Sequence, residues 1–549
     1  MKNYNLRQQG FTLIELLAVI VILAVIALIA TPMILGVIDT AKHGAAESSA
    51  LGFVDAIEKT VILKMMDGEV MKGDYTVAEL KNSVSFKGNG PSKGKITIST
   101  VGEVSSATLC INNYKISYDG KKAEVVETNC DDMSEVLEKY TESILNGTDP
   151  VLGTNMIPVI IADNGDVTYA DTNTKWYNYA SKVWANAVIL IDSPSTTYVI
   201  GDTIIENDIE SYFVWVPRYK YKLFNTGEYS GYITGKNSTS NAQTIEIVFE
   251  SKDKTVSNGT LVGNYLTHVT FTTLDVNGMW VGKFETGYAG ATSIGTAHVN
   301  TIDSSKIIVK PNVYSWRYNT VYNMFMSAYN YDTTNGSHMM KNTEWGAVSY
   351  LSSSVYGINK EVNINNNSSY LTGYSAVEGT DQSKFYGTFE ASSDITLPYN
   401  TTTGYLASTT GNISGIYDMS GGAHEYMASY ISGQLGSSGF DTTTIANTDY
   451  TKYLDVYNAS STIDSYQYRI LGDATGEMGP FYYYKDGDNN YRRHNGWYAD
   501  GSNFVEASNP WFYRGGSFYY GVLAGQFFFD RITGEGIPYM GSRLVLAIN

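Results

Sequence analysis

The sequence has few positive charges. Its 549 residues include 37 Lys and Arg against 55 Asp and Glu, so the formal net charge at pH 7 is −18. Only 17% of the residues are charged. A protein that binds nucleic acid presents a basic face to the phosphate backbone. The charge balance therefore predicts that this chain has no nucleic-acid partner.

Cysteine is also scarce, because Cys110 and Cys130 are the only two in the chain. In an exported protein, one close pair of cysteines forms a disulfide more often than it forms a metal site. We therefore expect a disulfide between Cys110 and Cys130. The alternative is two unpaired thiols in a reducing habitat.

Histidine is rare as well, and the six histidines show no metal-ligand spacing. His424 and Glu425 lack the second histidine that would complete a zinc-binding helix. We expect His338 to be a structural histidine, and Glu344 and Trp345 to pack within a helix instead of performing acid–base chemistry.

Calcium is the one cofactor that the sequence leaves open. Asp418, Glu425 and Asp473 carry hard oxygen atoms of the kind that Ca²⁺ binds. No other cofactor is expected, and the identity of any metal stays unknown at this point.

The length and composition favour an exported β-rich protein of two or three domains. No internal repeat of fixed period is apparent, which argues against a solenoid or a propeller. The 45 tyrosines and 52 glycines are typical of a loop-rich β protein whose surfaces are adhesive but uncharged.

The N-terminus holds a long hydrophobic run. A basic, polar leader over residues 1–10 ends at Gly10, and the hydrophobic stretch begins at Phe11. Its only charge is Glu15, and about 23 uncharged residues follow, where roughly 20 suffice to cross a bilayer as a helix. A secretory signal peptide is cleaved after its apolar region. Here the candidate cleavage site comes first, so we expect a membrane-spanning segment over 11–38 that survives processing.

These features resemble a type IV prepilin, down to Pro32, which matches the helix-kinking proline of such pilins. The resemblance implies that a prepilin peptidase cleaves after Gly10 and that the new N-terminal Phe11 is methylated. It also implies that the partners are the membrane and other pilin subunits.

Glu15 calls for a partner, because a carboxylate in a membrane helix costs about 2.5–3.5 kcal/mol by insertion scales. The amine of Phe11, on the same chain or on a neighbouring subunit, would supply it and would set the stagger of subunits in a filament. The alternative is a plain membrane anchor that carries a tolerated acid.

Apolar residues at helical spacing predict that the helix covers 11–66; they are Leu51, Val54, Ile57, Val61 and Ile62. A small pilin-like head is expected over 67–135, with a short helix near 77–80. Its predicted strands lie at 95–100, 114–118 and 123–127, with a hairpin turn at Asp119-Gly120. A spacer over 136–204, containing a small β element, would join this head to a large domain over 205–549.

Segments of the large domain resemble the formylglycine-generating-enzyme family, in the order of that family. They are YFVWVPRYKY (212–221), KNTEWGAVSYL (341–351), GIYDMSGGAHEY (415–426), RGGS (514–517) and GSRLVL (541–546). The resemblance implies a C-type-lectin-like domain with long loops on a small sheet framework, and an α+β class for the whole chain. That family's enzyme depends on cysteines in its C-terminal part. This chain has none after Cys130, so we expect no oxidation chemistry and no enzymatic activity.

The last forty or so residues resemble the variable region of proteins diversified by retroelements. In those proteins, randomised codons place aromatic, small and polar residues on a fixed lectin-like frame. Tyrosines there give large contact area at low entropy cost, as in antibody paratopes. Glu535 and Met540 depart from the pattern, and the alternative is an ordinary aromatic core, since the run 527–529 would then pack inward. The predicted ligand-binding residues are Phe518, Tyr519, Tyr520, Asp530, Ile532, Ile537, Pro538 and Tyr539.

The sequence thus predicts a surface-displayed pilin that acts as an adhesin. It would enter the cytoplasmic membrane as a prepilin and then reach the extracellular pilus, where it binds a protein or glycan on a cell or phage surface. Its large head would crowd a uniform filament shaft, which favours a minor or tip position. The alternatives are a pseudopilin of a secretion or DNA-uptake machine, and an enzyme on a formylglycine-generating-enzyme-like fold.

Overall fold

The computed structural model divides the chain into two units, Met1–Lys139 and Tyr140–Asn549. The structure describes residues 13–66, 73–77, 80, 84, 86, 90–99, 102–130, 146–222, 242–252, 265–377, 396–458, 469–478, 482–485 and 491–548. Within these ranges the chain is mixed α and β, with most of its regular structure in sheets.

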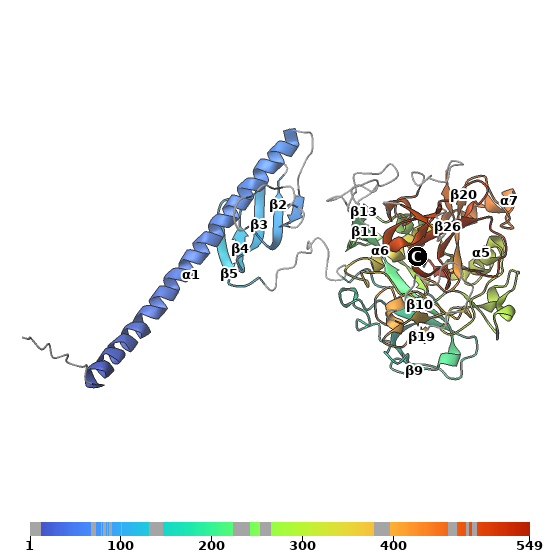
Figure 1. Cartoon of the computed structure of the whole chain (residues 1–549), viewed down its shortest axis with the longest axis horizontal. Helices are drawn as coiled ribbons and strands as arrows, with labels where there is room; N and C mark the ends of the chain where they lie inside the picture. Colours follow the sequence, from blue (N-terminus) through green and yellow to red (C-terminus); the bar gives the residue numbers. More distant parts are fainter. Residues whose placement is uncertain are drawn as a thin grey trace, which may run out of the picture. The chain divides into compact units, whose positions relative to one another are not determined.

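The first unit joins one long helix to a five-stranded antiparallel sheet (Figure 1). Helix α1 runs from Leu13 to Met66 and continues through Pro32. Among the described residues no helix is long and apolar enough to cross a membrane, so the span expected over 11–38 is not found there. The strands follow one another in space as in sequence: β1 (Gly73–Thr76), β2 (Lys93–Ile98), β3 (Val104–Ile111), β4 (Tyr114–Tyr118) and β5 (Ala123–Glu127).

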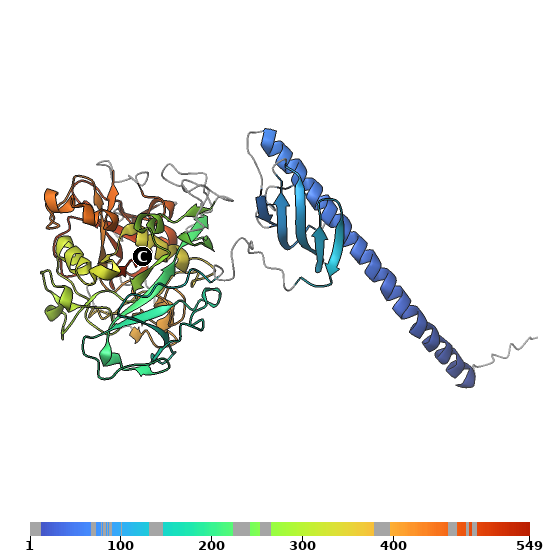
Figure 2. The same ribbon diagram turned by 180° about the vertical axis from the view of Figure 1, so that it is seen from behind.

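The sheet packs on one stripe along the C-terminal half of α1, as both views show (Figures 1 and 2). The helix predicted from Leu51, Val54, Ile57, Val61 and Ile62 is confirmed to Met66. Leu51 and Ile62 are 43% and 55% exposed, because each follows a buried residue by one position, a step of about 100° around the helix axis. The buried stripe consists of Ala46, Ala50, Phe53, Val54, Ile57 and Val61, at the spacing of an amphipathic helix.

Two carboxylates of α1 fix the sheet along the helix. The backbone N–H of Val125 donates to Glu47 Oε1 at 3.1 Å, and that of Val104 donates to Glu58 Oε1 at 2.9 Å. Val125 is in β5 and Val104 begins β3. The helix therefore holds two strands through their backbones as well as through apolar packing.

Local signals in the head agree with the structure. β4 and β5 occupy the predicted ranges 114–118 and 123–127, and the backbone N–H groups of Lys121 and Lys122 donate to Asp119 Oδ1 in the turn between them. Gly120 has φ +90°, which glycine adopts without steric cost. Cys110 and Cys130 form a disulfide, the pairing expected from their spacing. It ties β3 to the segment that follows β5.

The second unit contains two large sheets. The first is ordered β17 (Ser337–Met339), β28 (Leu544–Leu546), β14 (Gly278–Gly282), β10 (Ile209–Pro217), β8 (Asn186–Leu190), β6 (Met156–Ile161), β7 (Val167–Tyr169) and β9 (Thr203–Ile204). The second is ordered β21 (Asp455–Tyr457), β20 (His424–Ile431), β25 (Trp511–Gly515), β26 (Gly525–Ile532), β24 (Gly501–Ser502), β23 (Tyr491–Asn495) and β22 (Tyr482–Lys485), with β27 (Met540–Gly541) beside β20.

Smaller pairings and short helices complete this unit. The small sheets are β12 (Glu246–Phe249), β11 (Tyr219–Lys222) and β13 (Leu266–Thr267); β15 (Gly287–Tyr288) and β16 (Ile307–Ile308); and β18 (Tyr374–Ala376) and β19 (Thr396–Pro398). The α-helices are α4 (Val269–Leu274), α5 (Val321–Tyr329), α6 (Asn342–Ser352) and α7 (Thr442–Ile445).

The segment expected to be a spacer is largely part of the second unit. β8 lies between β6 and β10, with Val188 opposite both Ile157 and Tyr212. Residues 156–204 therefore build half of an eight-stranded sheet, and the boundary predicted at 204 is wrong. The apolar run 184–190 looked like an isolated β element because its neighbours in the sheet are distant in sequence.

The C-terminal segment contributes strands to both large sheets. β25, β26 and β27 belong to the second sheet, whereas β28 inserts between β17 and β14 of the first. The two loops within this segment, 516–524 and 533–539, are thus each held between strands at both ends.

Mutation can test which face of α1 packs against the sheet. Ile57 is fully buried and Ile62 is 55% exposed, so Ile57→Ala should cost about 2–5 kcal/mol of unfolding free energy through the lost packing. Ile62→Ala, as the matched control, should change it by less than about 0.5 kcal/mol. Hydrogen exchange of β2–β4 amides in increasing denaturant measures both. Equal losses for the two variants would contradict the register.

Candidate functional site

The predicted ligand-binding residues occupy two loops and one strand. Phe518, Tyr519 and Tyr520 lie in the loop 516–524 between β25 and β26, next to the 3-10 helix η14 (Gly521–Leu523). The loop 533–539 between β26 and β27 carries the second group. Its predicted members are Ile537, Pro538 and Tyr539. Asp530 and Ile532 belong to β26.

The structure brings the two loops together through a chain of aromatic rings. The ring centroids of Phe518 and Tyr519 are 5.4 Å apart, and those of Tyr519 and Tyr520 are 5.0 Å apart. Tyr520 then meets the His424 ring at 4.7 Å, and His424 meets Tyr539 at 5.7 Å. His424 is fully buried, so it forms the floor on which the rings of both loops rest.

Two residues distant in sequence contact the two loops, one through its ring and one through its backbone. Tyr370 packs edge-to-face on Phe518 with centroids 5.0 Å apart. Tyr318 reaches the other loop, since its backbone N–H donates to Ile537 O at 3.1 Å. We call Tyr318, Tyr370, Tyr519, Tyr520 and Tyr539 the tyrosine face.

The tyrosine face is partly open to solvent. Tyr318 is 42% exposed, and Tyr519, Tyr520 and Tyr539 are half-buried. Burial raises the pKa of the Tyr519 and Tyr539 hydroxyls, so both stay neutral at physiological pH. The face therefore offers ring edges and uncharged hydroxyls. Phe518, by contrast, is buried and supports the face from below.

Sequence reasoning missed Tyr318 and Tyr370. Both adopt left-handed backbone conformations, with φ +66° and +55°, which are uncommon for a non-glycine residue and cluster at binding sites. Neither residue belongs to the aromatic-rich C-terminal segment, and nothing in their local sequence signals the contact.

Asp530 does not belong to the tyrosine face. Its Oδ2 accepts from the Tyr513 hydroxyl at 2.8 Å, and its Oδ1 accepts from Asn503 Nδ2 at 3.1 Å. The side chain is buried, so the prediction that Asp530 contacts a ligand is replaced by an internal role. Ile532, opposite Trp511 in the sheet, packs against the core of the unit. For β26, the alternative prediction, an ordinary aromatic core that packs inward, is correct.

Below the face lies a group of buried acids with one arginine. Arg543 forms a two-bond ion pair with Glu425, at 2.6 and 2.9 Å. Asp418 accepts from the backbone N–H of Gly373 and from Asn365 Nδ2, each at 2.9 Å. Glu285 is as buried as these residues. Three carboxyls thus share one close guanidinium.

The excess of carboxyls keeps a proton inside this group. Burial, reinforced by the nearby Asp418 and Glu425, raises the pKa of Glu285 well above its ordinary value of 4.5. Glu285 accepts one hydrogen bond from the Ala423 backbone N–H at 2.9 Å. Glu425 forms the close ion pair with Arg543, and burial also raises the pKa of Glu425, to about 7, and the pKa of Asp418.

Asp473, the third residue considered for calcium, has other partners. Its Oδ2 accepts from the Tyr457 hydroxyl at 2.8 Å and its Oδ1 from the Thr475 backbone N–H at 2.9 Å. Within the described part of the chain, no group of three or more His, Cys, Asp or Glu side chains is arranged to hold a metal ion. The oxygens of Asp418, Glu425 and Asp473 are instead used in internal hydrogen bonds.

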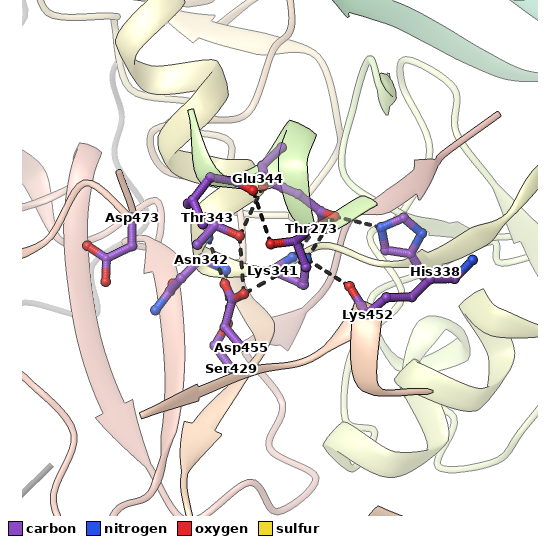
Figure 3. A network of polar contacts seen from close by, with 12 residues as sticks. Thr273, His338, Lys341, Asn342, Thr343, Glu344, Ser429, Lys452, Asp455 and Asp473 are labelled. Carbon is purple, nitrogen blue, oxygen red and sulfur yellow. Dashed lines mark hydrogen bonds and ion pairs between the residues drawn. The ribbon is translucent and has the colours of Figure 1, made fainter. Parts of the chain in front are cut away.

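His338 and Glu344 belong to a buried polar network at the start of α6 (Figure 3). His338 Nε2 lies 2.8 Å from Glu344 Oε1, and the backbone N–H of Lys341 donates to Glu344 Oε2 at 2.9 Å. Although burial alone would raise the pKa of Glu344, the adjacent His338 and Lys341 lower it. Both residues thus hold the helix N-terminus, in line with the structural roles expected for them.

The N-terminus resembles those of known proteins. Residues 5–31 match the family model of the prokaryotic N-terminal methylation motif. This N-terminus is type IV pilin-like. The motif supports a pilin-like surface or secretion-related protein that is processed by a prepilin peptidase and associates with other pilin subunits. Comparison with curated protein sequences gives no match for the chain.

The structure describes only some of the residues to which the pilin-like motif assigns a role. Gly10 and Phe11 lie outside the described residues, and Glu15 falls within α1. The roles of all three in processing and assembly therefore stay predictions that rest on the motif.

The buried carboxyls of the pilin-like chain predict a pH dependence of stability. Above about pH 4.5 the unfolded chain releases the Glu285 proton that the folded chain retains, so the unfolding free energy falls as the pH rises. Glu285→Gln removes its share of this titration and should make the decline between about pH 4.5 and 8 shallower, while other buried acids such as Asp473, whose pKa is raised to about 7, keep the rest. Urea denaturation at several pH values measures the slope.

The matched control is Glu246→Gln, which changes an exposed glutamate of β12. It should leave the pH slope as in the unmodified protein. A Glu285→Gln variant that kept the full slope would show that another group carries the proton.

Proposed function

We propose that the chain is a minor or tip pilin that acts as a surface adhesin and binds its ligand through the tyrosine face. The observation that carries this proposal is the gathering of five tyrosines from four chain segments on one partly exposed surface. Tyrosine combines a large apolar ring with a hydroxyl at low entropy cost. A face of this kind suits binding without turnover, so we propose no enzymatic activity.

The frame under the face supports the same proposal. Both loops are closed by strands, and the C-terminal strand β28 is paired on both sides in the first large sheet. Binding loops on a rigid scaffold can vary in sequence while the scaffold persists. Such a frame is compatible with a lectin-like domain whose loops are diversified. The ligand would be a protein or glycan on another cell or on a phage.

The N-terminal motif gives the route to the surface. A prepilin inserted in the membrane, cleaved after Gly10 and methylated at Phe11 would enter a pilus through α1. A unit of about 400 residues, 140–549, is too large to repeat along a closely packed shaft, which favours the minor or tip position.

Attachment should depend on the tyrosine face. Tyr519→Ala with Tyr539→Ala should abolish attachment of displaying cells to a panel of bacterial and animal cells, because each anchor contributes roughly 2 kcal/mol or more at an interface. We leave Tyr520 intact because its ring also packs on His424 and Phe528. The melting temperature is measured on the same variant.

The matched control is Tyr405→Ala, a half-buried tyrosine whose hydroxyl donates to Asp163 O at 2.8 Å, in the β6–β7 loop. Cells that display Tyr405→Ala should attach as cells that display the unmodified protein do. An unfolded double variant, or one that attaches as the control does, would retire the tyrosine face as the binding surface.

Assembly should depend on Glu15. If its carboxylate pairs with the amine of Phe11 in a low-dielectric filament, Glu15→Ala should insert in the membrane normally yet fall sharply in the pilus fraction. Mass spectrometry of that fraction should find wild-type chains that start at a methylated Phe11. Recovery of the intact leader there, or normal incorporation of Glu15→Ala, would contradict the proposed route.

A further inference from the structure

Arg317 is a fully buried arginine at the junction of the two loops of the tyrosine face. Its Nη1 donates to Pro538 O, and its Nη2 donates to Ile294 O at 3.4 Å. Its Nε donates to Ser315 O at 3.3 Å. The guanidinium carbon also stacks 3.9 Å from the ring centroid of Tyr370. One side chain therefore contacts the loop 533–539 directly and the loop 516–524 through Tyr370 and Phe518.

Glu285 favours the charged form of Arg317 without forming an ion pair with it. None of the ion pairs formed among the described residues includes Arg317, and its hydrogen-bond acceptors are backbone carbonyls. Burial lowers its pKa to about 10, so it remains charged at neutral pH. Burying an ion without a counter-ion is unfavourable for stability. Within the described structure, Arg317 is therefore held by hydrogen bonds to backbone carbonyls and by the contact with Tyr370, and not by a close ion pair.

The backbone beside Arg317 is strained on both sides of the contact. Tyr318 follows Arg317 directly with φ +66°, and Tyr370, on which the guanidinium stacks, has φ +55°. A left-handed conformation costs roughly 1–2 kcal/mol for a residue with a Cβ. Such strain persists only where surrounding contacts over-determine it, commonly at binding sites. The bonds and the stack of Arg317 supply contacts of this kind.

We propose that Arg317 is the positioning residue of the tyrosine face. Its planar, forked guanidinium holds Pro538 at one edge and Tyr370 against its flat surface, a combination that lysine cannot reproduce. Arg317 thereby sets the spacing of Tyr539 from Tyr519 and makes Tyr318 and Tyr370 part of the same surface. The inference deepens the proposed function, since the face has its use in binding, but the geometry can be tested without any ligand.

Hydrogen exchange of the whole chain tests this proposal. In Arg317→Met, four amides whose hydrogen bonds hold one or the other loop in place should exchange about tenfold faster or more, as local opening becomes easier. Arg531→Met is the matched control, because Arg531 lies on β26 and bonds Phe504 O and Glu506. It should leave the four amides unchanged. The four hydrogen bonds run from Tyr318 N–H to Ile537 O, from Phe518 N–H to Gly422 O, from Tyr520 N–H to Ser517 O and from Met540 N–H to Ile537 O.

Arg317→Lys separates positioning from charge. It keeps the cation but loses the fork and the stack, so we expect exchange at both loops to rise as in Arg317→Met. Wild-type exchange in Arg317→Lys would overturn the proposal, and so would a change confined to one loop. A rise spread evenly over the unit, including the Phe527 amide that donates to Asp500 Oδ2, would also overturn it, since that is the sign of a merely structural role.

A double-mutant cycle that combines an Arg317 variant with Tyr370→Leu tests whether Arg317 acts on the loop 516–524 through Tyr370. If Arg317 holds the loop 516–524 through Tyr370, the double variant should exchange at Phe518 no faster than the faster single variant. Additive effects would overturn this route. Because exchange is measured without a ligand, failure of attachment by the wild-type protein would count against the adhesin proposal and not against the role of Arg317.

Discussion

Helix α6 is buried on every side, and the second unit is arranged around that constraint. All eleven of its residues, Asn342–Ser352, are inaccessible to water. The first amide groups of a helix have no partner within it, and a buried amide without a partner is costly. Here protein groups replace water: Thr343 N–H donates to Asp455 Oδ2 at 2.8 Å, and Asn342 N–H donates to Ser429 Oγ at 2.9 Å (Figure 3). The strands that carry these groups, β20 and β21, must therefore lie against the helix.

The same helix anchors the strands under the tyrosine face. Trp345 Nε1 donates to Gln526 O of β26 at 2.7 Å, and Arg514 of β25 donates from Nε to Asn342 Oδ1 at 3.0 Å. β25 and β26 border the loop 516–524 and are held at its base. On the other side, the Tyr219 hydroxyl of β11 donates to Ala347 O at 2.7 Å. The strands that border the loop 516–524 are thus fixed by polar contacts with α6, whereas the rings of Tyr520 and Tyr539 pack against the core from the loops.

The buried acids of the second unit are likewise held by internal polar contacts. The chain is acidic overall, with a net charge of −18, and several of its carboxyls are buried within hydrogen-bond networks. Asp418 and Asp473 each accept hydrogen bonds from backbone N–H groups, and Glu425 pairs with Arg543. These acids maintain the loops in position, and those whose pKa is raised by burial, Glu285 among them, make the frame sensitive to pH. Acidic residues that suggested calcium in the sequence are explained by these internal contacts.

Several features of the chain were determined by the sequence alone. The methylation motif, the helix end at Met66, the Asp119-Gly120 turn and the Cys110–Cys130 pairing each depend on residues close together in the chain. Local chemistry specifies them whatever the rest of the molecule does.

Other features were decided only by tertiary structure. β8 became a central strand because Val188 meets partners from 31 and 24 positions away, at Ile157 and Tyr212. Asp530 turned inward to Tyr513. The tyrosine face gained Tyr370 through Arg317 and Phe518, and Tyr318 through its hydrogen bond to Ile537. Burial and facing direction depend on which distant segments meet, and hydrophobic or aromatic character along the chain does not carry that information.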